Sequence, residues 1–227
     1  MSQVFVSWSG GKDGCLALYR AKQAGHNIRY LFNMVSEDKK RSRSHGVRAV
    51  VIKEQARALG IPIIQQSTVD EEYEAVFIKK LKDLKRRGVE MGVFGDIDFE
   101  PHREWVERVC KAAGMTAQLP LWQENQSELL EEFINAGFKA IVITVKADLM
   151  GKEFLDRILD KKLIADIAGL DKNITPCGEA GEFHTLVVDG PIFKKRLDLT
   201  KTEIVSRGEH HFLEILKTEL KPKKGGT

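Results

Sequence analysis

The residues best suited to chemistry lie near the amino terminus, in the run Ser9-Gly10-Gly11-Lys12-Asp13-Gly14. This run follows a short apolar segment over 4–8 and precedes a helical pattern over 13–24. Glycines let a backbone turn sharply and approach a ligand closely. The N–H groups freed by such a turn, together with a helix N-terminus, favour a negatively charged ligand. Lys12 adds a positive charge and the Ser9 hydroxyl a donor, so the sequence predicts a phosphate-binding loop.

Asp13 carries the wrong charge to contact a phosphate directly. It fits either of two roles, a ligand of a metal ion that bridges phosphates or a helix cap. Two familiar phosphate loops do not match, because Walker A needs GxxxxGK followed by Ser or Thr and the dinucleotide fingerprint needs GxGxxG. The loop therefore indicates phosphate binding of another kind, and the alternative is a tight turn that happens to contain a lysine.

A second group of polar residues follows the apolar run 89–94. Asp96 and Asp98 lie in the loop after it, where they can contact a metal or a substrate amine or simply form a turn. His102 and Arg103 belong to the next helical segment. Arg103 and Glu107 are four residues apart, so Arg103 either forms a surface ion pair or grips the substrate or a phosphate.

These residues need a scaffold, and the first half of the chain supplies one by alternating strand and helix patterns. Strands are predicted at 4–8, 28–34, 61–64 and 89–94, and helices at 13–24, 47–59, from a cap at Asp70 to Gly88, and from Pro101 to Gly114. This rhythm predicts an α/β fold with a parallel, doubly wound sheet of Rossmann-like type. Such sheets bind ligands at the carboxyl ends of their strands, near a topological switch point.

The second half is less regular and predicts a smaller C-terminal α+β domain. Helices are expected at 127–136, 152–160 and 161–168, strands at 138–145, 185–188 and 203–205, and a frayed basic tail at 221–227. We place the domain boundary at 119/120, giving domains 1–119 and 120–227. Exposed strand-like runs in the second half favour a homodimer.

Composition excludes several classes of protein. The chain has 227 residues with 42% hydrophobic and 30% charged residues, typical of a globular protein. A net charge of +3 is too small to argue for nucleic acid. No apolar run reaches the roughly 20 residues of a membrane span, and no signal peptide is recognised, so we expect a cytoplasmic protein. The three cysteines lack any CxxC pair, which disfavours disulfides and a Cys-rich zinc site.

The loop SGGKDG resembles the SGGKDS pyrophosphate loop (PP-loop) of the N-type ATP pyrophosphatases. Within them the chain is similar to the diphthine–ammonia ligase group, which functions in diphthamide biosynthesis. Residues 177–185, CGEAGEFHT, resemble that group's acidic GE-x-GE-F-x-T segment. A third block comprises Gly95-Asp96-Ile97, HREWVE at 102–107, and Leu121-Trp122. The three blocks occur in family order and span most of the chain.

The resemblance implies an ATP-dependent ligase. In that family a substrate carboxylate attacks the α-phosphate of ATP and releases pyrophosphate, and ammonia then displaces AMP to leave an amide. The acceptor implied is diphthine of elongation factor 2, and Mg²⁺ is expected on the phosphates, with Asp13 as its ligand. Lys12, Asp13, Glu179 and Glu182 are the implied catalytic residues. Gly95, Asp96, His102, Arg103, Glu182 and His184 are expected to bind the substrate.

Further nucleotide contacts are expected from Met34 and His45. The backbone near Met34 ends a predicted strand, where this fold class receives adenine. His45 lies in a polar loop, so contact with the nucleotide competes with a plain surface position. Glu179 and Glu182 bracket a turn of small residues, with His184 behind them. These groups can hold a cation, orient ammonia or deprotonate ammonium, the alternative being an exposed acidic turn.

The chain departs from the family at the last loop position, where Gly14 replaces the usual Ser. One phosphate-facing hydroxyl is lost, although the backbone N–H is kept. This leaves two alternatives to the ligase. One is an ATP-binding regulator without turnover, and the other is a PP-loop ATP pyrophosphatase with a different carboxylate or a tRNA substrate, the latter disfavoured by the weak net charge and the lack of a cysteine pair.

Overall fold

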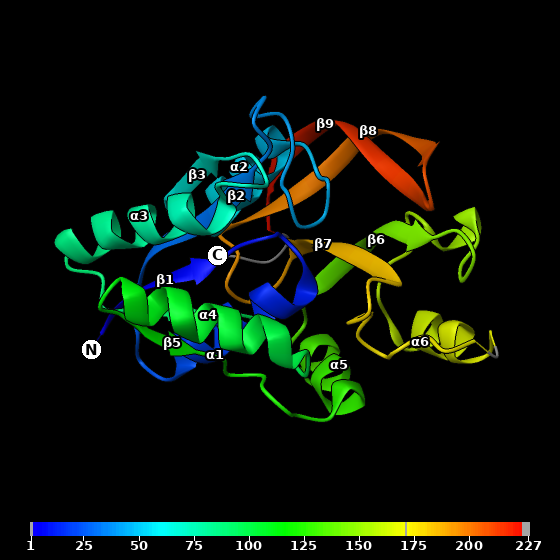
Figure 1. Cartoon of the computed structure of the whole chain (residues 1–227). Coiled ribbons are helices and arrows are strands. Elements are labelled where there is room, and N and C mark those ends of the chain that lie inside the picture. Colours follow the sequence, from blue (N-terminus) through cyan, green and yellow to red (C-terminus); the bar gives the residue numbers. More distant parts are fainter. Residues whose placement is uncertain (1, 171, 224–227) are drawn as a thin grey trace. The chain divides into compact units, whose positions relative to one another are not determined.

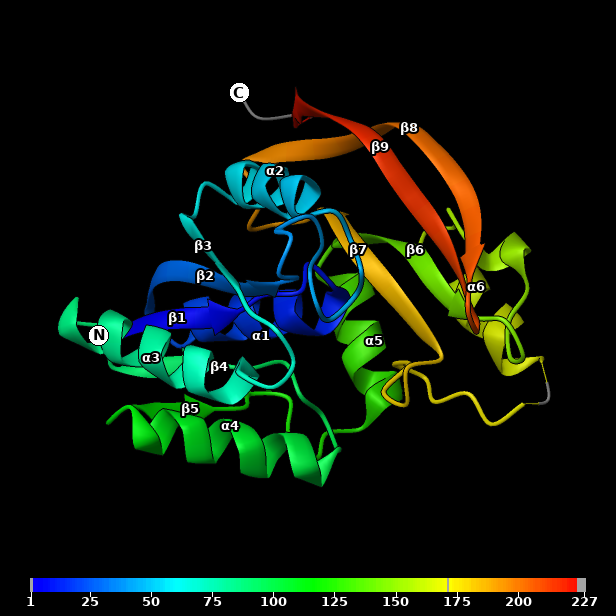
Figure 2. The same ribbon diagram turned by 45° about the horizontal axis from the view of Figure 1, so that its top comes forward.

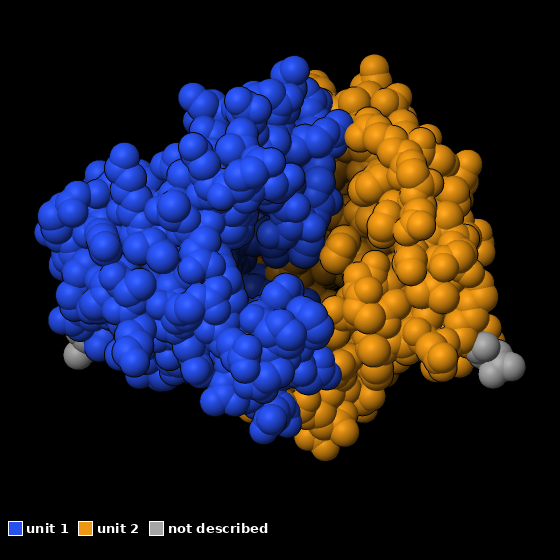
Figure 3. Space-filling view, viewed as in Figure 1, with its two compact units in different colours: residues 1–9, 13–57, 61–123 blue, residues 10–12, 58–60, 124–227 orange. Residues whose placement is uncertain are grey.

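The computed structural model describes residues 2–170 and 172–223, which divide into two compact units (Figure 3). The N-terminal unit comprises residues 1–9, 13–57 and 61–123, and the C-terminal unit comprises 10–12, 58–60 and 124–227. Each unit has its own β-sheet. The phosphate-binding loop is shared between the units, because its residues 10–12 belong with the C-terminal unit.

The N-terminal unit is built on a parallel sheet with strand order β3-β2-β1-β4-β5 (Figure 1). Its strands are β1 Gln3–Ser7, β2 Asn27–Val35, β3 Ile63–Ser67, β4 Met91–Val93 and β5 Thr116–Gln118. Its helices are α1 Lys12–Gln23, α2 Ala49–Leu59, α3 Tyr73–Arg86 and α4 Glu100–Ala112. The chain moves from β1 to β2 and β3 and then returns to β4 on the other side of β1. The switch point, where ligands bind in such sheets, therefore lies at the ends of β1 and β4.

Helices α3 and α4 cover one face of this sheet, with α2 on the other (Figure 2). Phe5 anchors the core beneath them, edge-on to Phe32 and Phe94 at 5.9 and 5.8 Å between ring centroids. Phe77 and Trp105 pack α3 against α4 at 4.8 Å. The predicted parallel doubly wound sheet is confirmed. Strand β5 was not predicted, because three residues are too few to show a periodic pattern.

The predicted cap of α3 is wrong. The helix begins at Tyr73, and the capping position is held by Glu72 without a side-chain hydrogen bond. The main chain turns first, with the Tyr73 N–H donating to the Asp70 carbonyl at 3.2 Å. The Asp70 carboxylate instead forms an ion pair with Arg43. Because this turn comes first, α3 begins three residues after Asp70, and the aspartate is too far from the helix to cap it.

The C-terminal unit contains an antiparallel sheet with strand order β7-β6-β9-β8. Its strands are β6 Lys139–Lys146, β7 Phe183–Asp189, β8 Lys195–Arg207 and β9 His210–Pro222. Its helices are α5 Gln126–Asn135, the single 3₁₀ turn η1 Lys152–Phe154, and α6 Lys161–Ala168. The helix predicted over 152–160 is thus reduced to η1. Within residues 2–170 and 172–223, no helix is both long and apolar enough to cross a membrane.

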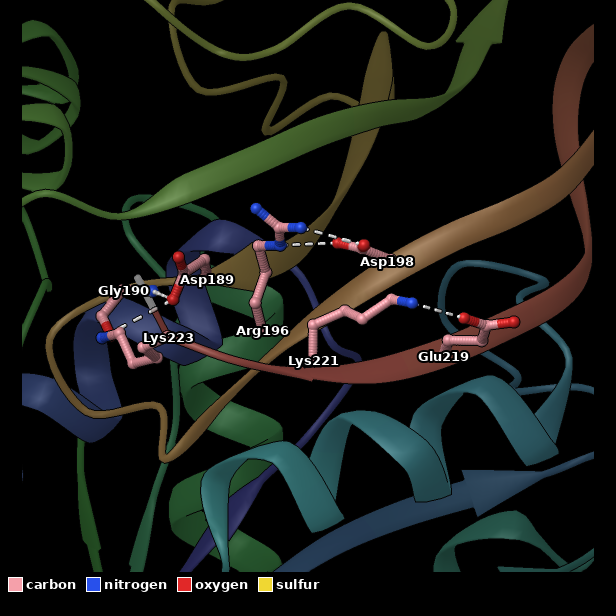
Figure 4. A network of polar contacts seen from close by, with 7 residues as sticks. All are labelled: Asp189, Gly190, Arg196, Asp198, Glu219, Lys221 and Lys223. Carbon is pink, nitrogen blue, oxygen red and sulfur yellow. Dashed lines mark hydrogen bonds and ion pairs between the residues drawn. The ribbon is translucent and has the colours of Figure 1, made fainter. Parts of the chain in front are cut away.

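The end of β9 is held in place, contrary to the predicted fraying from 221 onward. Lys221 and Pro222 pair with Arg196 and Lys195 of β8. Figure 4 shows the side chains involved: Lys221 pairs with Glu219 at 2.8 Å and Lys223 donates to the Gly190 carbonyl at 2.7 Å. Residues 224–227 of the predicted tail lie outside the described residues. Ion pairs this exposed contribute about 0–1 kcal/mol each, so the strand pairing itself holds the segment.

Gly190 lies where the chain leaves β7, and a Cβ atom there would overlap the ring of Phe138. We expect Gly190→Ala to lower the free energy of unfolding by about 1–3 kcal/mol, because the ring would have to leave a close-packed position. Gly169→Ala is the matched control, since its Cβ would approach nothing nearer than 3.5 Å. Urea denaturation measures both, and an equal loss in the two variants would contradict this packing.

Candidate functional site

The phosphate-binding loop leaves the carboxyl end of β1 and opens α1. Gly10 has φ of 89°, a conformation that side chains other than glycine's rarely tolerate. Lys12, Asp13 and Gly14 form the first turn of α1, whose main-chain N–H groups have no partner within the helix. Ser9 precedes the turn. The structure therefore places the predicted anion-binding groups at a helix N-terminus and at the switch point of the sheet.

The loop after β4 lies directly against this turn. A Cβ added to Gly95 would stand 2.6 Å from the Gly14 nitrogen and 2.7 Å from the Asp13 carbonyl carbon. Only a glycine allows two backbones to approach so closely. The structure thus brings Gly95 together with the first turn of α1. Gly14 is different, because a Cβ there would meet only the Ser7 carbonyl, at 3.5 Å. The serine typical of the family would fit without strain.

Asp96 and His102 are also brought together. The His102 Nδ1 atom lies 3.2 Å from the Asp96 carboxylate, and the His102 ring stacks edge-on against Phe99 at 4.8 Å. Phe99 is about half exposed, which is uncommon for a large apolar side chain. Asp96, His102 and Phe99 therefore form a small acidic and aromatic surface at the end of β4.

Arg103 is engaged by its own helix. Its Nε donates to the Glu107 carboxylate at 2.9 Å, and its guanidinium lies 5.2 Å from the Trp122 ring centroid. The hydrogen bond to Glu107 raises the pKa of Arg103. Of the two roles predicted for Arg103, this arrangement matches the surface ion pair.

The expected adenine contacts lie around the end of β2. Met34 points into the core, and its carbonyl accepts the Arg43 N–H at 3.0 Å. The buried Asn33 ties this region together, since its amide donates to the Trp8 carbonyl at 2.8 Å and to the Ser42 hydroxyl at 2.9 Å. His45 follows in the same loop and is partly buried. Asn33 thus joins the end of β1 to the loop that carries His45.

In the C-terminal unit, strand β7 holds the middle of the phosphate-binding loop. The Val187 N–H donates to the Gly10 carbonyl at 2.9 Å, and the Lys12 N–H donates to the Thr185 hydroxyl at 3.1 Å. The Lys12 side chain is only 4% exposed. Its ammonium group donates to the Cys177 carbonyl and lies 5.3 Å from the centroid of the Phe183 ring.

The acidic segment places its two glutamates in different environments. Glu182 is 1% exposed; its Oε1 accepts the Thr175 N–H at 2.6 Å, and its Oε2 has no hydrogen-bond partner among the described residues. Glu179 is partly exposed, and its main-chain N–H donates to the Thr175 hydroxyl at 2.8 Å. A buried carboxylate oxygen without a partner is costly, so Glu182 is the stronger candidate for chemistry.

His184 is the second residue of β7 and lies two positions after Glu182. Burial, with the charge of Lys12 as the next cause, lowers the pKa of His184 to about 4. The imidazole is therefore neutral near pH 7 and can both donate and accept a hydrogen bond.

The donor set around these residues bears on the expected metal. Within the described part of the chain, no three or more His, Cys, Asp or Glu side chains are grouped to hold a metal ion. Mg²⁺ does not need such a cage, because it is commonly bound by one or two carboxylates together with substrate phosphates and water. Asp13, partly exposed in the first turn of α1, fits that single-carboxylate arrangement.

Several contacting residues were not predicted as site residues. Phe183, Thr185 and Cys177 contact Lys12 through a ring, a hydroxyl and a main-chain carbonyl. Their only sequence signal was their place inside the acidic segment, and the contact of Cys177 in particular is made by its main-chain carbonyl, which leaves no trace in residue type.

A parallel sheet with a glycine- and lysine-containing loop at its switch point defines a phosphate-binding α/β protein. Comparison with known proteins gives the family. Residues 2–117 match the diphthamide synthase N-terminal domain, and residues 125–220 match the diphthamide synthase C-terminal domain. The chain belongs to the diphthamide synthase family, which confirms the resemblance seen in the sequence.

Two named relatives align with this sequence over most of its length. The diphthine–ammonia ligase of Schizosaccharomyces pombe is 32% identical over 91% of this chain, which spans 38% of that protein. The diphthine–ammonia ligase of Bos taurus is 30% identical over 91% of this chain and 86% of its own length. A solved structure, the predicted subunit of tRNA methyltransferase from Methanocaldococcus jannaschii DSM, is similar with a TM-score of 0.43 and 16% identity, covering 86% of this chain and 100% of that one.

The contact between Gly95 and the first turn of α1 can be tested by ATP affinity. We expect Gly95→Ala to weaken ATP binding by about tenfold or more, because the added Cβ would push against the main chain of Asp13 and Gly14. Gly14→Ser is the control at the same turn, and it should bind ATP at least as tightly as the parent. Isothermal titration calorimetry measures both, and tighter binding by Gly95→Ala would contradict the geometry.

The low pKa of His184 predicts a pH-dependent stability. The folded state resists protonation until about pH 4, whereas an unfolded histidine takes up a proton near pH 6.5. The stability that neutral His184 preserves is therefore present above pH 6.5 and is lost as the pH falls toward 4. The loss in the free energy of unfolding amounts to about 2 kcal/mol at pH 5. Urea denaturation at pH 7 and pH 5 should therefore show a smaller drop for His184→Gln than for the parent. Equal drops would show that His184 titrates normally.

Proposed function

We propose that this protein is an AMP- and pyrophosphate-forming ligase that uses ATP and ammonia to convert a carboxylate into an amide. The observation that carries the proposal is the family match across both domains, with the phosphate-binding loop at the switch point of the sheet. The names of the relatives support diphthine as the proposed acceptor, and the sequence resemblance implies that this is the diphthine of elongation factor 2. An acceptor on a translation factor would place the reaction in the cytoplasm.

The first step needs stabilisation of a leaving pyrophosphate. The acceptor carboxylate attacks the α-phosphorus, the bond to the β-phosphate oxygen breaks, and an acyl adenylate forms. In our proposal the main-chain N–H groups of the loop Ser9–Gly14 and the ammonium of Lys12 bind the β- and γ-phosphates and stabilise the charge that develops there. When bound, Mg²⁺ would supply further positive charge on the phosphates, with Asp13 as its protein ligand.

The second step needs neutral ammonia. The nitrogen attacks the acyl carbon, AMP leaves, and one proton is lost from the attacking nitrogen. Glu182 is our candidate for the base, because its buried Oε2 can accept a proton, and the neutral His184 beside it can orient the nucleophile through a hydrogen bond. Glu179, more exposed, would contribute negative charge that attracts ammonium toward the turn.

The acceptor is proposed to use the residues at the end of β4. Gly95 keeps this loop close to α1, and Asp96 with His102 offers a carboxylate and an imidazole to the acceptor's cationic and polar groups. Arg103 is proposed to bind the acceptor with its guanidinium group oriented by the ion pair with Glu107. Domain 1–119 would then bind ATP, and domain 120–227 would bind the substrate. The homodimer favoured by the sequence stays a prediction.

Product analysis tests the reaction. With ATP, ammonium chloride and diphthine-bearing elongation factor 2, the protein should form AMP, pyrophosphate and amide in equal amounts. Formation of ADP would exclude the mechanism. ATP binding without turnover on this or any other carboxylate would instead favour the non-catalytic regulator. AMP release only with a different carboxylate, or with tRNA, would keep the chemistry and change the substrate.

Lys12→Ala should lower turnover by roughly a hundredfold or more, because it removes a positive charge aimed at the leaving group. Lys22→Ala is the matched control, since Lys22 is exposed on the same helix. Steady-state release of pyrophosphate measures both variants. A Lys12→Ala enzyme as active as the control would remove Lys12 from the mechanism.

A further inference from the structure

We propose that Phe183 and the Cys177 carbonyl are positioning groups for the ammonium of Lys12, so that the acidic segment of the C-terminal unit sets how tightly the phosphate-binding loop holds a triphosphate. The inference rests on the proposed function in one respect, that Lys12 binds the pyrophosphate part of ATP. It adds that residues more than 160 positions away in the sequence decide where this charge is held.

The first support is the burial of Lys12. A side chain that is 4% exposed has lost most of its contact with water, and a buried ammonium is costly unless protein groups solvate it. The Cys177 carbonyl accepts a hydrogen bond from it, and the Phe183 ring lies within the roughly 6 Å at which a ring face attracts a cation. A carbonyl and a ring hold an ammonium without neutralising it. These two contacts therefore orient the charge of Lys12.

The second support is the way the Cys177 carbonyl is fixed. The Cys177 N–H donates to the Gln126 side chain at 2.8 Å, and its thiol donates to the Gln126 carbonyl at 3.4 Å. Gln126 is the first residue of α5. Cys177 itself lies in a turn that is closed by the Gly178 N–H, which donates to the Thr175 carbonyl at 3.0 Å. The Cys177 carbonyl, which accepts the hydrogen bond from Lys12, is thus fixed by contacts with α5 and by its place in a turn.

The third support is the pattern along β7. Phe183 and Thr185 occupy alternate positions of one strand, so their side chains lie on the same face, and Val187 lies two positions further along. Each contacts the loop: Phe183 contacts the Lys12 ammonium, Thr185 the Lys12 N–H, and Val187 the Gly10 carbonyl. One strand therefore fixes both the main chain and the charged end of the loop.

Two glycines in the same turn allow a matched test. Gly178 has φ of 70°, and a Cβ there would lie 2.7 Å from the Phe183 carbonyl oxygen and 3.0–3.1 Å from its ring. Gly181 has φ of 81°, and a Cβ there would meet nothing within 4 Å. Alanine at either position bears a similar backbone strain, but only Gly178→Ala displaces Phe183. We expect Gly178→Ala to bind ATP about tenfold more weakly than Gly181→Ala, by isothermal titration calorimetry.

A second series of variants, at Phe183 itself, tests the inference if Gly178→Ala does not fold. Phe183→Tyr keeps the ring and should bind ATP within about twofold of the parent, whereas Phe183→Leu should bind about tenfold more weakly. Stepwise fluorination of the Phe183 ring should weaken ATP binding in proportion to the loss of negative charge on its face. A merely structural role would follow side-chain size and give no such trend.

A readout without nucleotide separates this inference from the proposed function. The Phe183 ring should shift the NMR signals of the Lys12 ε-methylene protons upfield, and Phe183→Leu should abolish that shift. If the parent protein fails to bind ATP, the proposed function falls while this signal still reports the contact. If the parent binds ATP, equal affinities of the two glycine variants, or no trend on fluorination, would overturn the inference.

Discussion

The arrangement of the loop depends on keeping one ammonium group inside the protein. Lys12 begins a helix whose first turn carries a partial positive charge, so its own helix does not stabilise the ammonium group. The partners that solvate it come from the C-terminal half of the chain, at Cys177 and Phe183. This explains why residues 10–12 belong with the C-terminal unit although their neighbours on both sides do not. The loop is formed by consecutive residues, but the groups that hold its lysine come from a distant part of the sequence.

Glycines near the loop serve different physical purposes. Gly10 allows a left-handed backbone conformation, and Gly95 allows two main chains to touch. Gly178 does both, since it has positive φ and lies against Phe183. Gly14 does neither, because space for a side chain exists there. The departure from the family's serine is therefore a loss of one hydroxyl rather than a change of shape.

The acidic segment separates two carboxylates that look equivalent in the sequence. Glu182 is buried with one oxygen bonded to the main chain, whereas Glu179 stays partly in solvent. The two glutamates therefore differ in their exposure to water and in their hydrogen-bond partners. The surface formed by Asp96, His102 and Phe99 has a different character, with a partly buried carboxylate that contacts His102 and a half-exposed aromatic ring suited to a cationic group.

The sequence by itself determined the parallel sheet, the position of the glycine-rich loop and the family. Strand–helix alternation and a glycine-rich turn are local patterns, and local patterns are written in consecutive residues. It did not yield β9, whose apolar positions are interrupted by charged ones, nor the turn that displaced Asp70 from the start of α3. Only the tertiary structure decided what surrounds Lys12, because its partners act through a carbonyl and a ring that lie far along the chain. Contacts of that kind depend on how the backbone folds back, which residue types alone do not encode.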